Sequence, residues 1–337
     1  MDIKETLKIL CEPAGVAGSE KAASEAALRL LLQFMPNAEI DSFGTVTGSV
    51  IHGENLPLLL LDAHIDEIGM IVNFIDENGF LKVGRAGSVD RRALPAATVT
   101  VHGKKPVKGV VCALPPHVEK DENKALKEED IAIDCGFTKT EAEKLISLGD
   151  CVTLDAEFVE LQNGRISARA LDDRAGVCAV LQALDLLKGK RLKYNFAVSF
   201  SSQEELGLRG AAIAAYNINP DLAIAVDVSY GDFPGAKENK TWKLGGGVML
   251  GTAPVLDRGL FERLKSLAEG KNIPHQIEVM SGKTGTDADA ISLARSGVKC
   301  ALLSIPLRNM HTPAEVCAAA DIEAAARLIA EFVGGEA

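Results

Sequence analysis

Five short segments place histidines or acidic residues where predicted strands end or predicted helices begin. They are His64-Ile65-Asp66, Asp172-Asp173-Arg174, Gln203-Glu204-Glu205, Val226-Asp227-Val228 and Met310-His311-Thr312. An unpartnered charge at the end of an apolar run is costly to remove from water, so these side chains suggest one shared cation site. Imidazole nitrogens and carboxylate oxygens are common ligands of zinc-like ions. The pattern therefore predicts a hydrolytic metalloenzyme.

Two of the segments contain residues that could divide the chemistry between them. Asp66 follows His64 by two positions, and a carboxylate there can hold the second ring nitrogen of a ligating histidine. Glu204 and Glu205 precede Gly207 in a predicted turn, so one could bind metal while the other moves protons. The structural alternatives are a strand-end histidine beside a solvated aspartate and a solvated acidic turn.

The remaining segments suggest a bridge between two ions and further ligands. Asp172 or Asp173 could supply a bridging carboxylate, since paired ions lie about 3.5 to 4 Å apart in dinuclear sites. Asp227 interrupts an aliphatic run, where its structural alternative is a helix cap or a buried ion pair. His311 precedes an expected helix that begins at Pro313 and ends near Phe332, and alone it could belong to an ordinary capping loop.

The elements that must position these residues follow from the aliphatic runs. Buried parallel strands are expected at 56–63, 195–202, 222–228 and 298–305, with helices at 173–187 and 257–269 between them. This alternation predicts an α/β fold with a doubly wound sheet. Ligands collect at the carboxyl ends of strands in such sheets, so residues far apart in the sequence can converge there.

The sequence pattern in the middle of the chain differs from the pattern on either side of it. From residue 70 to residue 160, short strand-like pieces are separated by glycine, proline and charge clusters, with one clear helix at 138–148. We therefore expect an inserted β-rich domain at 70–160, and a catalytic domain formed by residues 1–69 and 161–337.

Composition excludes several classes of protein. The net charge of -11 over 337 residues argues against nucleic acid or an acidic membrane surface as a partner. No stretch reaches the ~20 apolar residues of a membrane span, and the N-terminus has no signal-like pattern, so a cytoplasmic location is expected. The seven cysteines form no C-x-x-C pair, which favours reduced thiols over disulfides or a cysteine zinc site.

At these residues the sequence resembles the tetrahedral aminopeptidases. This family of cytosolic dinuclear metallopeptidases includes glutamyl, leucyl and lysyl aminopeptidases, and some relatives carry a cellulase label. The resemblance covers nearly the whole chain through the motifs His64-Ile65-Asp66-Glu67-Ile68-Gly69, Ala170-Leu171-Asp172-Asp173-Arg174, Gln203-Glu204-Glu205-Leu206-Gly207-Leu208-Arg209-Gly210-Ala211, Gly285-Thr286-Asp287-Ala288 and His311-Thr312-Pro313-Ala314-Glu315.

The resemblance implies a site with two divalent ions per subunit, zinc or cobalt. One ion would be bound by His64, Asp172 and Asp227, and the other by Asp172, Glu205 and His311. It further implies that Glu204 is the general base and acid, and that Asp66 orients His64. The peptide bond between Asp172 and Asp173 would be cis.

The resemblance also implies how substrate is bound. The segment 282–287, with Thr286 and Asp287, would line the substrate pocket. Lys283 stands in a stretch that is usually richer in glycine, and there it could favour an acidic N-terminal side chain. A solvent-facing loop lysine is the simpler interpretation.

At the level of the fold, the resemblance implies a zinc-exopeptidase-like mixed sheet with helices on both faces. The inserted domain would be PDZ-like or barrel-like and would form dimers, with matches at 114–117 and 133–137. Dimers would assemble into a homo-oligomer, a tetrahedral dodecamer, that acts on peptides.

Three other functions stay open. A dinuclear deacylase or dipeptidase would use the same ligands on another amide. A glycoside hydrolase would use two carboxylates about 5 to 9.5 Å apart without metal. Sugar sites commonly present aromatic platforms, for which one Trp and three Tyr are few. A non-catalytic assembly protein would be expected to have lost part of the ligand set. Neither the native metal nor the preferred N-terminal residue follows from the sequence.

Overall fold

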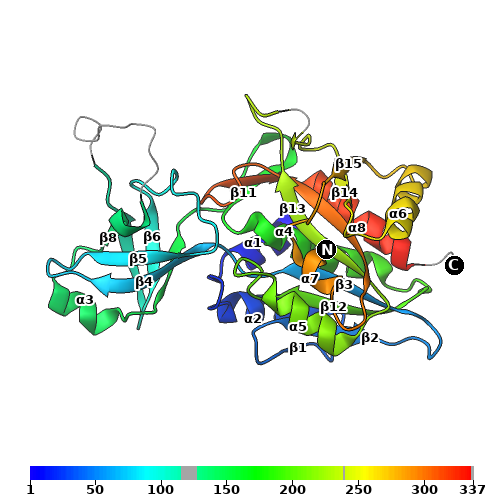
Figure 1. Ribbon diagram of the computed structural model, residues 1–337, viewed down its shortest axis with the longest axis horizontal. Helices are drawn as coiled ribbons and strands as arrows, with labels where there is room; N and C mark the ends of the chain where they lie inside the picture. Colours follow the sequence, from blue (N-terminus) through cyan, green and yellow to red (C-terminus); the bar gives the residue numbers. More distant parts are fainter. Residues whose placement is uncertain (115–126, 238–239, 335–337) are drawn as a thin grey trace.

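The computed structural model describes residues 1–114, 127–237 and 240–334 (Figure 1). Within them, eight strands form a mixed sheet in the order β1 (Glu39–Ile40), β2 (Val46–Val50), β12 (Asn195–Ser201), β3 (Leu58–His64), β13 (Leu222–Tyr230), β16 (Lys299–Leu307), β14 (Val248–Thr252) and β15 (His275–Val279). The four central strands β12, β3, β13 and β16 run parallel to one another. They include the aliphatic runs that the sequence predicts as buried strands.

Helices cover both faces of this sheet. One face packs against α1 (Ile3–Cys11), α2 (Lys21–Leu31), α4 (Leu171–Leu187), α6 (Arg258–Gly270) and α8 (Ala319–Val333). The other packs against α5 (Arg209–Ile218) and the short α7 (Asp287–Ile291). Helix α4 is buried on nearly every side because it lies between the sheet and helices α1 and α8. The predicted doubly wound mixed sheet is therefore confirmed.

The middle of the chain forms a separate barrel with its own apolar core (Figure 1, left). Its described strands close in the order β4 (Gly69–Ile75), β5 (Leu81–Ala86), β8 (Ala132–Asp134), β7 (Pro106–Val111), β6 (Thr98–His102) and β9 (Cys151–Leu154). Helix α3 (Lys139–Leu145) begins with a capping box formed by Thr138 and Glu141. The prediction of an inserted barrel is confirmed, while the domain limits of 70 and 160 stay a prediction. Residues 115–117 of the predicted dimerisation match lie outside the described residues.

A small sheet lies next to the main one and corrects one expectation. It pairs β10 (Val159–Glu160), β11 (Arg165–Ala168) and β17 (Glu315–Ala318) in this order, and 3-10 turns occur at Glu128–Asp130 and Gln162–Gly164. The predicted helix from Pro313 to Phe332 is wrong at its start, because residues 315–318 pair with β11 as a strand. Helix α8 begins only at Ala319. Among the described helices, none has the length and apolar character needed to cross a bilayer.

Candidate active site

The strand ends of the main sheet bring the predicted site residues from β3, β12 and β13 together. His64 is the last residue of β3, and Asp227 lies near the end of the neighbouring strand β13. Glu204 and Glu205 lie in the turn that follows β12. All three strands are parallel, so their carboxyl ends meet at the same edge of the sheet.

Two irregular backbone segments supply the remaining residues. Asp172 and Asp173 stand at the start of α4 with non-helical dihedral angles, and the peptide bond between them is cis, as the resemblance implies. His311 lies in the turn after β16 with a φ of 63°, in the left-handed region. Glu315 at the start of β17 fixes both segments, because its carboxylate accepts the backbone N–H groups of Asp172 at 3.0 Å and His311 at 2.9 Å.

The carboxylate of Asp172 lies between the two histidines. One of its oxygens is 3.0 Å from Nε2 of His64, and the other is 3.3 Å from Nε2 of His311. The same nitrogen of His311 is 3.2 Å from a carboxylate oxygen of Glu205. Asp227 Oδ1 lies 4.0 Å from Nε2 of His64. Asp172 therefore connects a His64–Asp227 pair with a His311–Glu205 pair.

The donor chemistry of these side chains fits divalent ions. Asp172, Glu205 and His311 offer ligand atoms within 4.8 Å of one another, and so do His64, Asp173 and Asp227. The second group contains Asp173 where the prediction has Asp172. The Asp173 carboxylate, however, already accepts the backbone N–H groups of His64 and Gly176. Mixed nitrogen and oxygen donors of this kind suit zinc and its neighbours.

Electrostatics at the site also favour added positive charge. Burial, together with the nearby Asp227, raises the pKa of Glu204 to about 10. Burial likewise raises the pKa of Asp227 well above its usual range. Burial disfavours protonated His311, but its hydrogen bonds to Asp172 and Glu205 outweigh this and raise its pKa to about 11. Cations bound among these acids would relieve both the desolvation and the mutual repulsion.

Asp66 has a wider role in the site than the sequence predicts. Its carboxylate lies 3.5 Å from Nδ1 of His64, while its own backbone carbonyl is closer, at 3.2 Å. The two carboxylate oxygens accept the backbone N–H groups of Glu204 at 3.0 Å and Glu205 at 3.1 Å. Asp66 therefore joins the end of β3 to the turn that carries both glutamates.

The two predicted substrate-binding residues lie in different environments. Thr286 lines the pocket next to His64 and Asp172. Asp287 is buried, and its Oδ2 accepts a hydrogen bond from Ser201 of β12 at 2.5 Å. Lys283 is exposed and lines the same pocket as Thr286.

Sequence reasoning assigned no role to two buried groups. Glu315 closes the motif that begins at His311, and its signal in the sequence is an acid directly before a short apolar run. Glu67 follows Asp66 and pairs with both Arg169 and Arg174, the second at 3.2 Å. No sequence spacing links residue 67 to residues 169 and 174, because the contact depends on the packing of α4 under β3.

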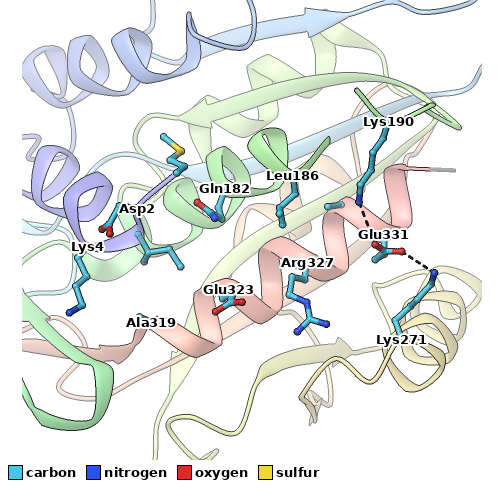
Figure 2. A pocket seen from close by; sticks show the side chains of 13 residues that line it. Asp2, Lys4, Gln182, Leu186, Lys190, Lys271, Ala319, Glu323, Arg327 and Glu331 are labelled. Atoms are coloured by element: carbon cyan, nitrogen blue, oxygen red, sulfur yellow. Dashed lines mark hydrogen bonds and ion pairs between the residues drawn. The ribbon is translucent and has the colours of Figure 1, made fainter. Parts of the chain in front are cut away.

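The site opens into a pocket of about 450 Å³ that contains the candidate ligands. A second pocket has a volume of about 580 Å³ (Figure 2). It is lined by the N-terminal end of α1 and by residues of or next to α4, α6 and α8. Its lining includes Glu331, which pairs with Lys190 and Lys271. Neither group of candidate metal ligands lies in this second pocket.

The mixed sheet, the inserted barrel and the histidine–carboxylate cluster define a metallopeptidase. Residues 44–328 match the family model described as M42 glutamyl aminopeptidase, and the chain belongs to this family of aminopeptidases. It is 32% identical to the lysyl aminopeptidase of Pyrococcus furiosus, over 95% of this chain and 93% of that protein. The resemblance to aminopeptidases that the motifs suggest is thereby confirmed.

Solved structures agree with this assignment. An aminopeptidase from the archaeon Desulfurococcus kamchatkensis superposes with a TM-score of 0.93 and 34% identity, covering 98% of this chain and 94% of that one. The TET1 peptidase of Pyrococcus horikoshii, which can assemble into a tetrahedron or a large octahedral shell, superposes with a TM-score of 0.87 and 30% identity. That match covers 99% of this chain and 100% of the other.

Proposed function

We propose that this aminopeptidase holds two divalent ions, zinc or cobalt, at the sheet edge. One ion would be bound by His64, Asp172 and Asp227, and the other by Asp172, Glu205 and His311. The observation that carries this proposal is the position of Asp172, whose two oxygens lie 3.0 and 3.3 Å from separate histidine nitrogens. We choose Asp172 over Asp173 as the bridge because the carboxylate of Asp173 is occupied by two backbone N–H groups.

We further propose that Glu204 is the catalytic base and acid. Its carboxylate oxygen lies 4.0 Å from Nε2 of His64, and it lines the pocket. When bound, the two ions would acidify a water molecule and polarise the scissile carbonyl. Positive charge nearby would also lower the raised pKa of Glu204 into a range where it can accept a proton. Glu204 would take a proton from the attacking water and transfer it to the leaving amine as the C–N bond breaks.

Backbone contacts support this division of roles. Asp66 accepts the N–H groups of Glu204 and Glu205, so it would hold the base and a ligand in fixed relation to His64. Thr286 would contact substrate from the pocket wall. For Asp287 we propose a positioning role instead, because its carboxylate is directed to Ser201.

We propose peptides with a free N-terminus as substrates. The acid-rich pocket suits the positive charge of an α-ammonium group. We also propose a homo-oligomer, with the barrel as the dimerisation domain and a tetrahedral dodecamer as the assembly. The assembly of the related Pyrococcus horikoshii peptidase supports this. A cytoplasmic location is proposed because the seven cysteines are free thiols.

The deciding experiment compares free and N-acetylated aminoacyl amides as substrates, before and after chelation and after restoration of zinc or cobalt. Cleavage that requires metal and a free amine is expected. Cleavage of the acetylated substrates would instead support the deacylase that shares these ligands. Metal-independent cleavage, or no cleavage of either kind, would contradict the proposed site.

A further inference from the structure

Beyond the candidate ligands, the active-site pocket contains one buried acid that the proposed chemistry does not use. Glu278 of β15 lines the pocket although only 4% of it is exposed. One of its carboxylate oxygens accepts a hydrogen bond from the hydroxyl of Ser229 at 2.5 Å, and the other accepts one from Ser304 at 2.8 Å. Within residues 1–114, 127–237 and 240–334, no cation is paired with this carboxylate.

Glu278 occupies the part of the pocket next to the metal site. Ser229 lies two residues after Asp227 on β13, so both side chains point to the same face of the strand, about 7 Å apart along it. Ser304 on β16 is the register partner of Asp227. A side chain that extends from the N-terminal residue of a bound peptide would therefore run from the candidate metal ligands toward Glu278.

Apolar side chains in the wall of this pocket suit a long aliphatic stem. Leu302 of β16 and Met280 line the same pocket, and Leu302 is 1% exposed. Lysine and arginine combine a flexible hydrocarbon stem with a terminal positive charge. Their stems would contact the apolar walls, and their charged ends would meet Glu278.

Two other charged residues of the pocket are less suited to select substrate. The carboxylate of Asp289 accepts the backbone N–H groups of Thr284 and Gly285, each at 3.0 Å, and so holds the loop. Lys283 lies exposed, where solvent and salt screen its charge. A buried carboxylate interacts more strongly with a charged partner, and it gains more from acquiring one.

We propose that Glu278 determines specificity and that the preferred substrates are peptides that begin with lysine or arginine. This inference rests on the proposed aminopeptidase function, because it assigns the side chain of the N-terminal residue to the pocket beside Asp227. It agrees with the simpler interpretation of Lys283 as a solvent-facing loop lysine.

The test compares lysyl, norleucyl, leucyl and glutamyl amides as substrates of the metal-loaded enzyme. Norleucine has the lysine stem without the ammonium group, so the lysine-to-norleucine ratio of kcat/KM isolates the charge. The free energy of a hydrogen bond to a charged group corresponds to a difference of about 10- to 150-fold in kcat/KM. We therefore expect a lysine-to-norleucine ratio of about tenfold or more. In Glu278→Gln this ratio should approach one while norleucine cleavage persists. The matched control Lys283→Gln should keep the ratio high.

Several outcomes would overturn the inference. A wild-type ratio near one would do so without any variant, and an unchanged ratio in Glu278→Gln would show that Glu278 acts only in packing. A preference for glutamyl amide that disappears in Lys283→Gln would assign selection to Lys283. If circular dichroism shows that Glu278→Gln does not fold, the lysine-to-norleucine ratios of wild type and of Glu278→Asp provide the test instead. Failure of the metal-loaded wild type to cleave any free-amine amide would overturn the proposed function as well.

Discussion

At the scale of single residues, the proposed site separates groups that would hold metal from a group that would move protons. Glu204 and Glu205 are neighbours, yet Glu205 lies 3.2 Å from His311 whereas Glu204 lies 4.0 Å from His64. Their backbone N–H groups share one acceptor residue, Asp66. Adjacent glutamates in a turn can therefore carry different tasks, as the sequence suggests.

Replacing Glu204 with glutamine tests the catalytic role directly. The amide has nearly the same shape but cannot accept a proton, so we expect kcat to fall about 10²- to 10⁴-fold. Metal content, measured by mass spectrometry of the purified protein, should stay unchanged. The control Glu205→Gln should instead lower metal content, because it alters a proposed ligand. Full turnover by Glu204→Gln would sink the assignment.

Asp66→Asn should disturb the site without removing a ligand. Asparagine offers one carbonyl oxygen where aspartate accepts two backbone N–H groups, so the turn bearing Glu204 and Glu205 should shift. Changes of this kind typically cost about 10- to 100-fold in metal affinity or activity. Metal titration and kcat measured on the same sample would check this. Wild-type values for both would show that the turn is held by other contacts.

At the scale of elements, the sequence predicts the parallel core well and the connecting segments poorly. The continuous aliphatic runs around Leu58–His64 and Leu222–Tyr230 are strong signals because both faces of these strands are buried. Strand β17 was missed because a segment as short as Glu315–Ala318 gains its structure from pairing with β11, which is distant in sequence. The candidate site follows the same rule: the sequence points to residues at strand ends, whereas the contacts of Glu315 and Glu67 depend on the tertiary fold.

The start of α8 provides a prediction about pH. The buried carboxylate of Asp321 accepts the backbone N–H groups of Gly245 and Gly247, and burial raises its pKa to about 6. Because the folded state holds this proton more tightly than the unfolded state, Asp321 lowers stability as pH rises from about 4 to 6, by at most about 3 kcal/mol.

The comparison of Asp321→Asn with wild type isolates this contribution. Thermal unfolding should be followed from pH 4 to pH 7, and the variant should lack the part of the decline that comes from Asp321. Loss of one hydrogen-bond acceptor should make the Asp321→Asn variant less stable than wild type at pH 4. The difference in stability between the two proteins should then narrow toward pH 7. A gap that is constant or that widens with pH would contradict the raised pKa.

At the scale of the whole molecule, the barrel and the α/β domain have separate apolar cores. The barrel also exposes apolar side chains on its outer surface, among them Ile71 at 43% and Phe74 at 54% on β4. The two residues lie three positions apart on the same strand, and exposed apolar surface can mark a contact with another subunit. They agree with a barrel that forms dimers.

Charge on this surface should weaken the proposed assembly. Phe74→Glu would place a carboxylate in an apolar contact, where it would be desolvated without a partner, so we expect smaller species in analytical ultracentrifugation. The side chain is half exposed in the single chain, so the fold should survive, and circular dichroism would verify this. The control Leu293→Glu changes an exposed residue of the α/β domain. If Phe74→Glu forms species of the same size as wild type, the exposed surface of β4 is excluded as the interface.

The position of Glu278 on strand β15 has a consequence for the history of such enzymes. The candidate metal ligands come from β3, β13, α4 and the turns after β12 and β16, whereas β14, α6 and β15 supply none of them. If both proposals hold, hydrolysis and substrate choice are encoded in separate stretches of the gene. Mutation within 275–279 could then change which N-terminal residues the enzyme prefers. The residues that carry out hydrolysis would meanwhile remain under selection.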